Sequence, residues 1–578
     1  MKSNKSKKVR RAAPAAVAVE APAGIPWWIY AVGAAAALFA AFQVYWPAIH
    51  GPFLLDDTHL QYALPGAERA TLGRWLRGPR PLLMFSYWVN FQQGRAQDTL
   101  VYHMTNVFIH FFNSAFILLA IRKVTGWAGV DKQNSWILSL FASGLFLLHP
   151  LQTESVAYVA GRSETLSVFW VLAALDVFLY RATDAISFPR AGVVLAFFAA
   201  AVLTKEHTLV LPALLLVTDY FWNPGFSLAG IRRNWKLYVP IAAGAALGIR
   251  YVLGILRAAG GTAGFHMAGL EWYQYFFTEC RVLWAYLRLF LMPIGQNLDP
   301  SVPISSNVME HGAIFGLAGL LAVSILTWIY RRRFPLAAYG WFIFLALIAP
   351  TSSFAPIRDP MGERRVYLPF IGLLFIVVEF LRRWKPGRNA LIGTLALVLV
   401  AEAGLTYQRN LLWANAVDLW RDTASKSRGV VRPQFNLAYA EYQAGSCTQA
   451  AEDFELASKY APATFDLYLD WALAYDCAGN SQKALETLQK AVALRPNAHV
   501  YSQIGMEYGK MGKYPEALDA LAMAEELNPR FAMTYFYLGN IHSIQGDQTR
   551  AIEDYRRVLA LDPGNEPAQA ALARLGAR

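Results

Sequence analysis

Two adjacent carboxylates, Asp56 and Asp57, follow the first long apolar run of the chain in the stretch "FLLDDTHL". A carboxylate at the edge of a membrane can accept the proton of a hydroxyl, bind a divalent metal ion or cap a helix. One aspartate is enough to cap a helix that begins near Thr58, so the pair favours catalysis or metal binding by at least one member. We predict that Asp56 is a general base and Asp57 its helper or a metal ligand, with the reverse assignment open.

Further charged residues lie where other apolar runs end, and their cations could bind the phosphate of a leaving group. Each has a plainer explanation as well. A histidine before a proline can mark an interfacial turn, a lysine can reach the headgroups, and a neighbouring Glu and Arg can pair with each other. The candidates for binding a phosphorylated substrate are His103, His149, Glu154, Arg162, Lys205, Glu206, Arg364 and Arg365.

The composition indicates the elements that must position these residues. The 578-residue chain is 56% hydrophobic and 16% charged and contains 18 Trp, which is typical of a polytopic membrane protein. Its net charge of +12 comes from Lys and Arg in short loops between apolar runs, so it indicates membrane orientation and no nucleic-acid partner. Three Cys are too few for a disulfide scaffold or a zinc ribbon.

We predict about eleven transmembrane helices in residues 26–408, preceded by a disordered basic cytoplasmic tail at 1–25. The first apolar run has no convincing cleavage site and is interpreted as an anchor. Segment 274–293 is apolar but carries Glu279, Arg281 and Arg288, so we interpret it as an amphipathic helix that lies at the outer surface or re-enters the membrane, in preference to a further span. The predicted spans are 26–48, 101–121, 134–149, 164–180, 190–204, 206–222, 236–253, 312–330, 336–350, 366–382 and 389–407.

The basic loops predict the orientation of these spans. Lys and Arg at 122–132, 181–190, 223–236, 331–333 and 382–388 place those loops, and the N-terminus, on the inner side. The aspartate pair, 149–164, Lys205 with Glu206, and 351–369 then all face outward. Charges close to a bilayer usually mark a functional site. The convergence of these loops therefore supports a functional site on the outer side more strongly than any single residue does.

A second kind of pattern begins at residue 431, where the sequence repeats every 33–34 residues. Small residues recur where two helices would cross, and a proline ends each unit, which is the tetratricopeptide pattern. We predict a connecting helix at 409–430 and, over 431–578, four repeats and a capping helix that form a soluble α-solenoid with a groove for protein. Cys447 and Cys477 lie in consecutive units, as a disulfide or as buried free thiols.

Six stretches together resemble the transmembrane and tetratricopeptide-repeat O-mannosyltransferases and their bacterial relatives in the C-type (GT-C) glycosyltransferase superfamily. They are "FLLDDTHL", "YHMTNVFIH", "HPLQTESVAYVAGRSE", "TKEH", "GERRVYLPFIG" and "TYQRNLLWANAVDLW", and they occur in the family's order over almost the whole chain. The resemblance implies an all-α GT-C membrane domain whose first outer loop carries the acidic pair. It also implies a polyprenyl-phosphate sugar donor, inversion at the anomeric carbon and transfer to Ser or Thr of proteins.

The predicted function is therefore transfer of a hexose, mannose being one candidate, from a polyprenyl-phosphate donor to a protein hydroxyl brought by the repeats. A divalent metal at Asp56 and Asp57 is compatible with this chemistry but is not required. The alternatives are a membrane-anchored scaffold for an envelope or secretion complex, and the same chemistry on a lipid or glycan acceptor. The outward segments contain no Asn-x-Ser/Thr sequence, which favours a multi-pass protein of the bacterial inner membrane with periplasmic repeats and membrane lipids around it.

Overall fold

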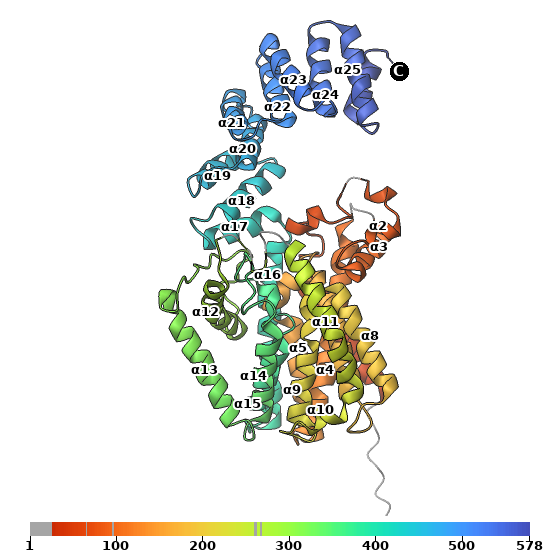
Figure 1. The fold of residues 1–578 in the computed structure, drawn as a ribbon, viewed down its shortest axis with the longest axis vertical. Coiled ribbons are helices and arrows are strands. Elements are labelled where there is room, and N and C mark those ends of the chain that lie inside the picture. Colours follow the sequence, from red (N-terminus) through yellow and green to blue (C-terminus); the bar gives the residue numbers. More distant parts are fainter. Residues whose placement is uncertain are drawn as a thin grey trace, which may run out of the picture.

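The computed structural model describes residues 26–64, 66–94, 98–258, 263–265, 267 and 269–577, so the predicted tail at 1–25 lies outside the described residues. The described chain is helical, with an isolated bridge between Ala263 and Ile357. Figure 1 shows a tall helical bundle with a curved array of helix pairs above it and the C-terminus at the far end of that array. The all-α prediction of a helical bundle followed by a repeat solenoid is confirmed.

Each of the eleven predicted apolar runs contains a helix. These are α1 (Trp27–Tyr45), α4 (Thr99–Trp127), α5 (Lys132–Leu148), α7 (Arg162–Leu179), α8 (Phe188–Thr204), α9 (Leu211–Trp222), α11 (Trp235–Ala258), α13 (Ala313–Ile329), α14 (Pro335–Ile348), α15 (Phe370–Leu381) and α16 (Arg388–Trp413).

The count of eleven membrane crossings is not confirmed. Among the described residues, five helices are long and apolar enough to cross a membrane, or six if the bent pair at 132–157 is one span. For α9, α14 and α15 the reason is length: they have 12, 14 and 12 residues, which at 1.5 Å per residue is about 18–21 Å of a hydrocarbon core about 30 Å thick.

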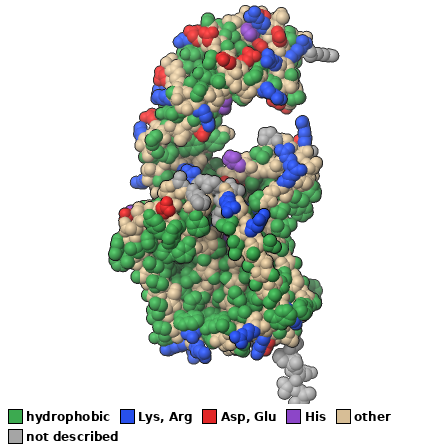
Figure 2. Space-filling model, in the orientation of Figure 1, with side chains coloured by type: hydrophobic (Ala, Val, Ile, Leu, Met, Phe, Trp, Pro, Cys, Tyr) green, Lys and Arg blue, Asp and Glu red, His purple; other side chains and the backbone are tan. Residues whose placement is uncertain are grey.

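The basic loops meet at one end of the bundle, as the pattern of Lys and Arg predicts. Arg382 donates to the carbonyl of Ala128 after α4, and Arg383 donates to the carbonyl of Arg333 between α13 and α14. Figure 2 shows Lys and Arg side chains at the end of the molecule opposite the repeats. We call this the basic end; its assignment to the inner side remains a prediction.

Segment 274–293 forms α12 (Trp272–Leu291), which is not among the five candidate spans. It packs against α13, and the two helices touch backbone to backbone at Gly316. A Cβ there would lie 2.5 Å from the carbonyl oxygen of Cys280, so only glycine permits this approach. Its predicted place at the outer surface stays a prediction.

The repeat array consists of four helix pairs and a final helix. The pairs are α18 (Val431–Gln443) with α19 (Cys447–Ser458), α20 (Phe465–Cys477) with α21 (Ser481–Leu494), α22 (Ala498–Lys510) with α23 (Tyr514–Leu527), and α24 (Ala532–Ile544) with α25 (Gln548–Leu561); α26 is Glu566–Arg574. Buried alanines such as Ala450 and Ala484 lie where the helices cross. In place of one connecting helix at 409–430, α16 ends at Trp413 and α17 (Ala416–Lys426) begins after the N-cap Asn415.

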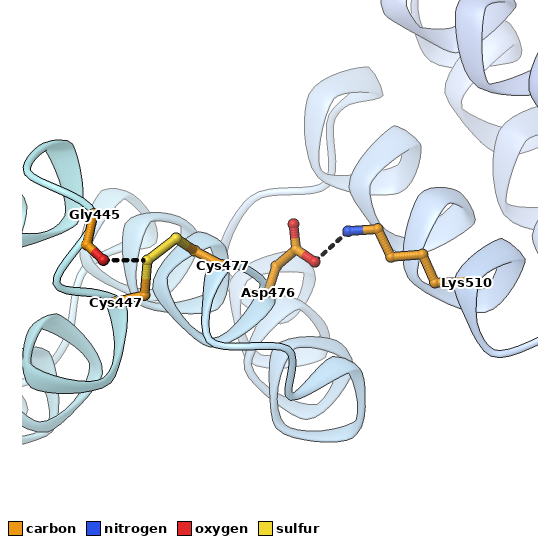
Figure 3. The surroundings of a disulfide bond; sticks show 5 residues. All are labelled: Gly445, Cys447, Asp476, Cys477 and Lys510. Atoms are coloured by element: carbon orange, nitrogen blue, oxygen red, sulfur yellow. Dashed lines mark hydrogen bonds and ion pairs between the residues drawn. A yellow bond between two sulfur atoms is a disulfide. The ribbon is translucent and has the colours of Figure 1, made fainter.

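Cys447 and Cys477 are joined by a disulfide, which resolves the two possibilities left open by the sequence (Figure 3). The bond links the first residue of α19 to the last residue of α20, with 5.6 Å between the two Cα atoms. It therefore ties the first repeat to the second.

We expect that replacing both of these cysteines by serine lowers the free energy of opening of α19 and α20 by about 3 kcal/mol. The bond closes a loop with a sequence separation of 30 residues, and a cross-link of this length removes that much entropy from the unfolded chain. Hydrogen exchange of the α19 and α20 amides measures the effect. A reductant should lower the protection of these amides in the wild type and leave it unchanged in the double variant. Equal protection of the wild type and the double variant without reductant would refute the bond.

Candidate functional site

The two aspartates of the first loop have different environments. Both lie on the 3₁₀-helix η1 (Leu55–His59). Asp57 is buried: its Oδ1 accepts hydrogen bonds from the Ala160 amide at 2.7 Å and the Tyr62 hydroxyl at 3.3 Å, and its Oδ2 accepts from the Leu54 amide at 3.0 Å. Both oxygens are engaged within the protein, so Asp57 holds the loop in place.

Asp56 is exposed, and its carboxylate has no hydrogen bond or ion pair within the described part of the chain. Its backbone amide donates to the Tyr158 hydroxyl at 2.8 Å. The preceding residue, Leu55, has a φ of +48°, a conformation that a branched side chain rarely adopts. Such backbone strain is typical of functional sites. The loop thus presents one free carboxylate on a constrained backbone.

The support under η1 is the turn at Tyr158–Gly161. Gly161 packs so closely that a Cβ would lie 2.6 Å from the Ser155 carbonyl oxygen and 2.8 Å from that of Tyr158. This tight turn aims the Ala160 amide at Asp57 and the Tyr158 hydroxyl at the Asp56 backbone.

Burial raises the pKa of Asp57 to about 7, against the lowering effect of its hydrogen bonds from Leu54, Ala160 and Tyr62. The folded protein therefore holds this proton to a higher pH than the unfolded chain does. Between the ordinary value of 3.8 and about 7, the unfolded state binds fewer protons, so stability falls as the pH rises.

We expect Asp57→Asn to remove this pH dependence. The thermal unfolding midpoint of the wild type in detergent should decline from about pH 4 to about pH 7 relative to that of the variant. A constant offset between the two proteins across this range would mean that Asp57 keeps an ordinary pKa. Asp56→Asn is the matched control, because Asp56 is exposed.

Three ion pairs form a cluster of charges on the loops around this turn. Arg364 binds Glu154 through its guanidinium and through its backbone amide, which lies 2.9 Å from Oε2. Lys205 binds Glu164, whose other oxygen is 3.5 Å from His207. A third pair joins Arg80 and Glu206, at 2.6 and 3.0 Å.

Arg364 links this cluster to the aspartate loop. Its charge acts on Glu164 and Lys205 and also on Tyr158, the residue that contacts the Asp56 backbone. The Arg364 side chain is 33% exposed, whereas its partner Glu154 is 2% exposed. Tyr158 thus connects the loop of the free carboxylate with a partly open cation, and such a cation can stabilise a phosphate leaving group.

Arg162 lies in the interior, away from any exposed surface. Its guanidinium is fully buried, donates to Asn106 Oδ1 and the Tyr102 carbonyl at 2.8 Å each and to the Ser86 carbonyl at 3.3 Å, and stacks over the Tyr87 ring. These contacts hold the helix that carries Ser86 and Tyr87, in the segment between α1 and α4, against α4, and each guanidinium nitrogen is engaged within the protein.

Arg365 is also enclosed, unlike its neighbour Arg364. It donates to the Tyr275 hydroxyl and to carbonyls of the 351–365 loop, including Pro360 at 2.7 Å, and lies 3.9 Å from Glu279. Its side chain is 7% exposed. It therefore fixes the loop that carries Arg364.

The two histidine candidates are buried as well. His103 Nε2 lies 3.2 Å from the Gly51 carbonyl oxygen. His149 accepts from the Leu151 amide through Nδ1, so its Nε2 donates to the Phe290 carbonyl. Both rings therefore contact backbone groups inside the protein.

Sequence reasoning did not include Arg80, Glu164 and His207 among the candidates, although they complete the charge cluster. Glu164 and His207 lie inside the stretches "GRSE" and "TKEH" that carried the resemblance. Arg80 lies between α1 and α4, 126 residues from Glu206, and no local signal pairs the two. No group of three or more His, Cys, Asp or Glu that could hold a metal is found in the described ranges.

The repeat array is anchored to the loops of this site. Arg432 of α18 binds Asp299, with Nε 2.6 Å from Oδ2, and binds Asp359 at 2.7 Å. Asn297 donates through its side chain to Ser427 and through its backbone to Glu363, the neighbour of Arg364. Figure 2 shows the array arching over a hollow. The lobe that contains α2 (Leu72–Trp75) and α3 (Pro81–Gly94) lies across this hollow from the outer part of the array (Figure 1).

The repeats match a known family: the tetratricopeptide repeat profile fits residues 435–499 and 503–566. Over most of its length the chain is similar to curated proteins that are named protein O-mannosyl-transferases. It is 22% identical to "Protein O-mannosyl-transferase TMTC3" of Mus musculus over 84% of this chain and 57% of that protein. It is 24% identical to "Protein O-mannosyl-transferase F38B6.6" of Caenorhabditis elegans over 66% and 54%.

The resemblance predicted from the six short stretches is confirmed by these relatives. The chain spans about half the length of the curated relatives that it matches. Among solved structures, that of YrrB, described as a TPR protein, aligns with 31% of this chain at 19% identity and a TM-score of 0.25, which is too low to inform function.

Proposed function

We propose, for a chain that is similar to protein O-mannosyl-transferases over most of its length, that it is a membrane glycosyltransferase. It takes a hexose, mannose by analogy with those relatives, from a polyprenyl-phosphate donor and transfers it to a Ser or Thr hydroxyl. The observation that carries this proposal is the free carboxylate of Asp56, on a loop that buried Asp57 holds in place, together with the partly open Arg364, whose charge acts on Tyr158 beside that loop.

In the proposed reaction, Asp56 accepts the proton of the acceptor hydroxyl while that oxygen attacks the anomeric carbon. The bond from this carbon to the phosphate oxygen breaks on the opposite face, and the configuration inverts. The leaving polyprenyl phosphate gains negative charge, which Arg364 and Lys205 stabilise. Asp57, Arg162 and Arg365 act as positioning residues, because their polar atoms are bound within the protein.

The repeat array would deliver the acceptor protein. Stacked helix pairs form a concave surface suited to extended polypeptide, and this array arches over the hollow above the bundle (Figure 2). The disulfide between Cys447 and Cys477 favours an oxidising compartment for the array, such as the bacterial periplasm. The basic end would then lie on the cytoplasmic side of the inner membrane.

Glycopeptide mass spectrometry tests this function in cells. Strains that lack the gene, carry it, or carry only the Asp56→Asn variant are compared for hexose on Ser and Thr. We expect hexosylated peptides in the wild type alone. Glycopeptides that are identical in all three strains would refute protein glycosylation. Loss of hexose from a lipid or glycan in the strain without the gene would indicate that the acceptor is that lipid or glycan. Restoration of the wild-type glycopeptides by residues 431–578 alone would support the alternative that the protein is a membrane-anchored scaffold.

A further inference from the structure

A cavity of about 380 Å³ lies at the basic end of the bundle, remote from the site just described. The end of α4, the end of α9, the turn after α9 and the turn before α14 surround it. Its lining includes Trp127, Phe221, Trp222, Phe226, Arg332 and Pro335. The wall is therefore aromatic, with one guanidinium.

Arg332 belongs to a run of three arginines, Arg331–Arg333, none of which forms an ion pair among the residues that the structure describes. The Arg332 guanidinium carbon lies 5.2 Å from the centre of the Phe226 ring, so an aromatic face and not a carboxylate supports it. This cation keeps its full charge for a ligand.

Two carboxylates on the helices around the cavity already bind other groups. Glu379 accepts from Arg382, Arg383 and the Leu336 amide. Asp219 accepts from Arg181 at 3.1 Å and also from Asn234 and Tyr238. Neither is paired with Arg332, so the charge of Arg332 stays available to a ligand.

Two further features indicate a built site. The turn that forms one wall holds Phe226 at a φ of +51° and Gly225 at +109°, and a non-glycine residue in this region is uncommon and costs energy. In addition, the indole N–H of Trp222, a residue of the cavity wall, is buried and has no hydrogen-bond acceptor among the described residues. Lys123 lies 5.4 Å from the Trp127 ring and adds a second cation nearby.

We propose that this cavity binds the phosphate headgroup of an anionic phospholipid. An unpaired guanidinium and an unused N–H donor suit a phosphodiester, and tryptophan rings suit the boundary between headgroups and acyl chains. Basic pockets between membrane helices are known to take such headgroups. The proposal is independent of the glycosyltransferase function and of which membrane face the basic end occupies.

The test uses the full-length protein in neutral detergent and native mass spectrometry. Phosphatidylglycerol and phosphatidylcholine are titrated in parallel, and inorganic phosphate is added as a competitor. We expect tight binding of phosphatidylglycerol only, weakened roughly tenfold in Arg332→Gln because one charge-assisted contact is lost. Trp222→Phe keeps the ring but removes the donor and should weaken binding by a few-fold.

Arg333→Gln is the matched control, since Arg333 has the same charge but does not line the cavity. Equal losses in Arg332→Gln and Arg333→Gln would overturn the proposal in favour of diffuse attraction to the basic end. Equal affinity for phosphatidylcholine would overturn it as well. Full displacement by inorganic phosphate at a similar affinity would assign the cavity to free phosphate. Melting temperatures of all variants confirm that they fold.

Discussion

Replacing Asp56 by asparagine is expected to lower kcat/KM for sugar transfer by about 10²- to 10⁴-fold, the largest effect of any single substitution in this protein. Asparagine keeps the shape of the side chain but cannot accept the proton of the acceptor hydroxyl. The fold should be unaffected, because the Asp56 carboxylate has no partner in the described part of the chain and its backbone contact to Tyr158 remains. The rate of mannosyl transfer from a polyprenyl-phosphate donor to an acceptor peptide measures the effect.

Asp57→Asn separates the base from its support. Asp57 is buried with both oxygens engaged, so this variant should lose stability together with part of its activity. Asp56→Asn should lose activity without loss of stability. Full activity in Asp56→Asn, or the opposite pattern with inactive but stable Asp57→Asn, would reverse the two roles.

Replacing Arg364 by glutamine is expected to give the second-largest effect, a fall of about 10²- to 10³-fold in kcat/KM for the donor. The cation is 33% exposed and can reach a phosphate, and the developing charge on the leaving group needs it most in the transition state. The loss should therefore appear as a lower kcat and a higher donor KM, while the acceptor KM stays unchanged.

Stability must be controlled in this experiment, because Arg364→Gln leaves the buried Glu154 without its partner. The double variant Glu154→Gln and Arg364→Gln removes both charges and should recover the melting temperature without recovering activity. Arg364→Lys keeps the charge but loses the forked geometry, so partial activity is expected. Activity restored in the double variant would show that Arg364 acts only as a structural partner of Glu154.

The sequence alone was sufficient to predict the helices and the repeats. All eleven apolar runs contain helices, and the four repeats occupy the predicted positions, because helix formation and repeat stacking follow local periodicity. The lengths of the spans were less predictable. The run predicted at 206–222 starts with a short 3₁₀-helix, Glu206–Val210, and becomes α-helical only at Leu211, which the sequence pattern does not reveal.

The tertiary structure decided the roles of the charged residues. In the sequence, nothing distinguishes Asp56 from its neighbour Asp57, or Arg364 from its neighbour Arg365. In the fold, Asp56 is exposed and Arg364 is partly exposed, whereas the side chains of Asp57 and Arg365 are buried.

The partners that cause these differences are distant in the chain: Ala160 binds Asp57 across 103 residues and Glu154 binds Arg364 across 210. Side-chain exposure and ion pairing depend on contacts between segments remote in sequence. Residue type and spacing therefore determined which chemistry is available here, and long-range packing decided which atoms are free to perform it.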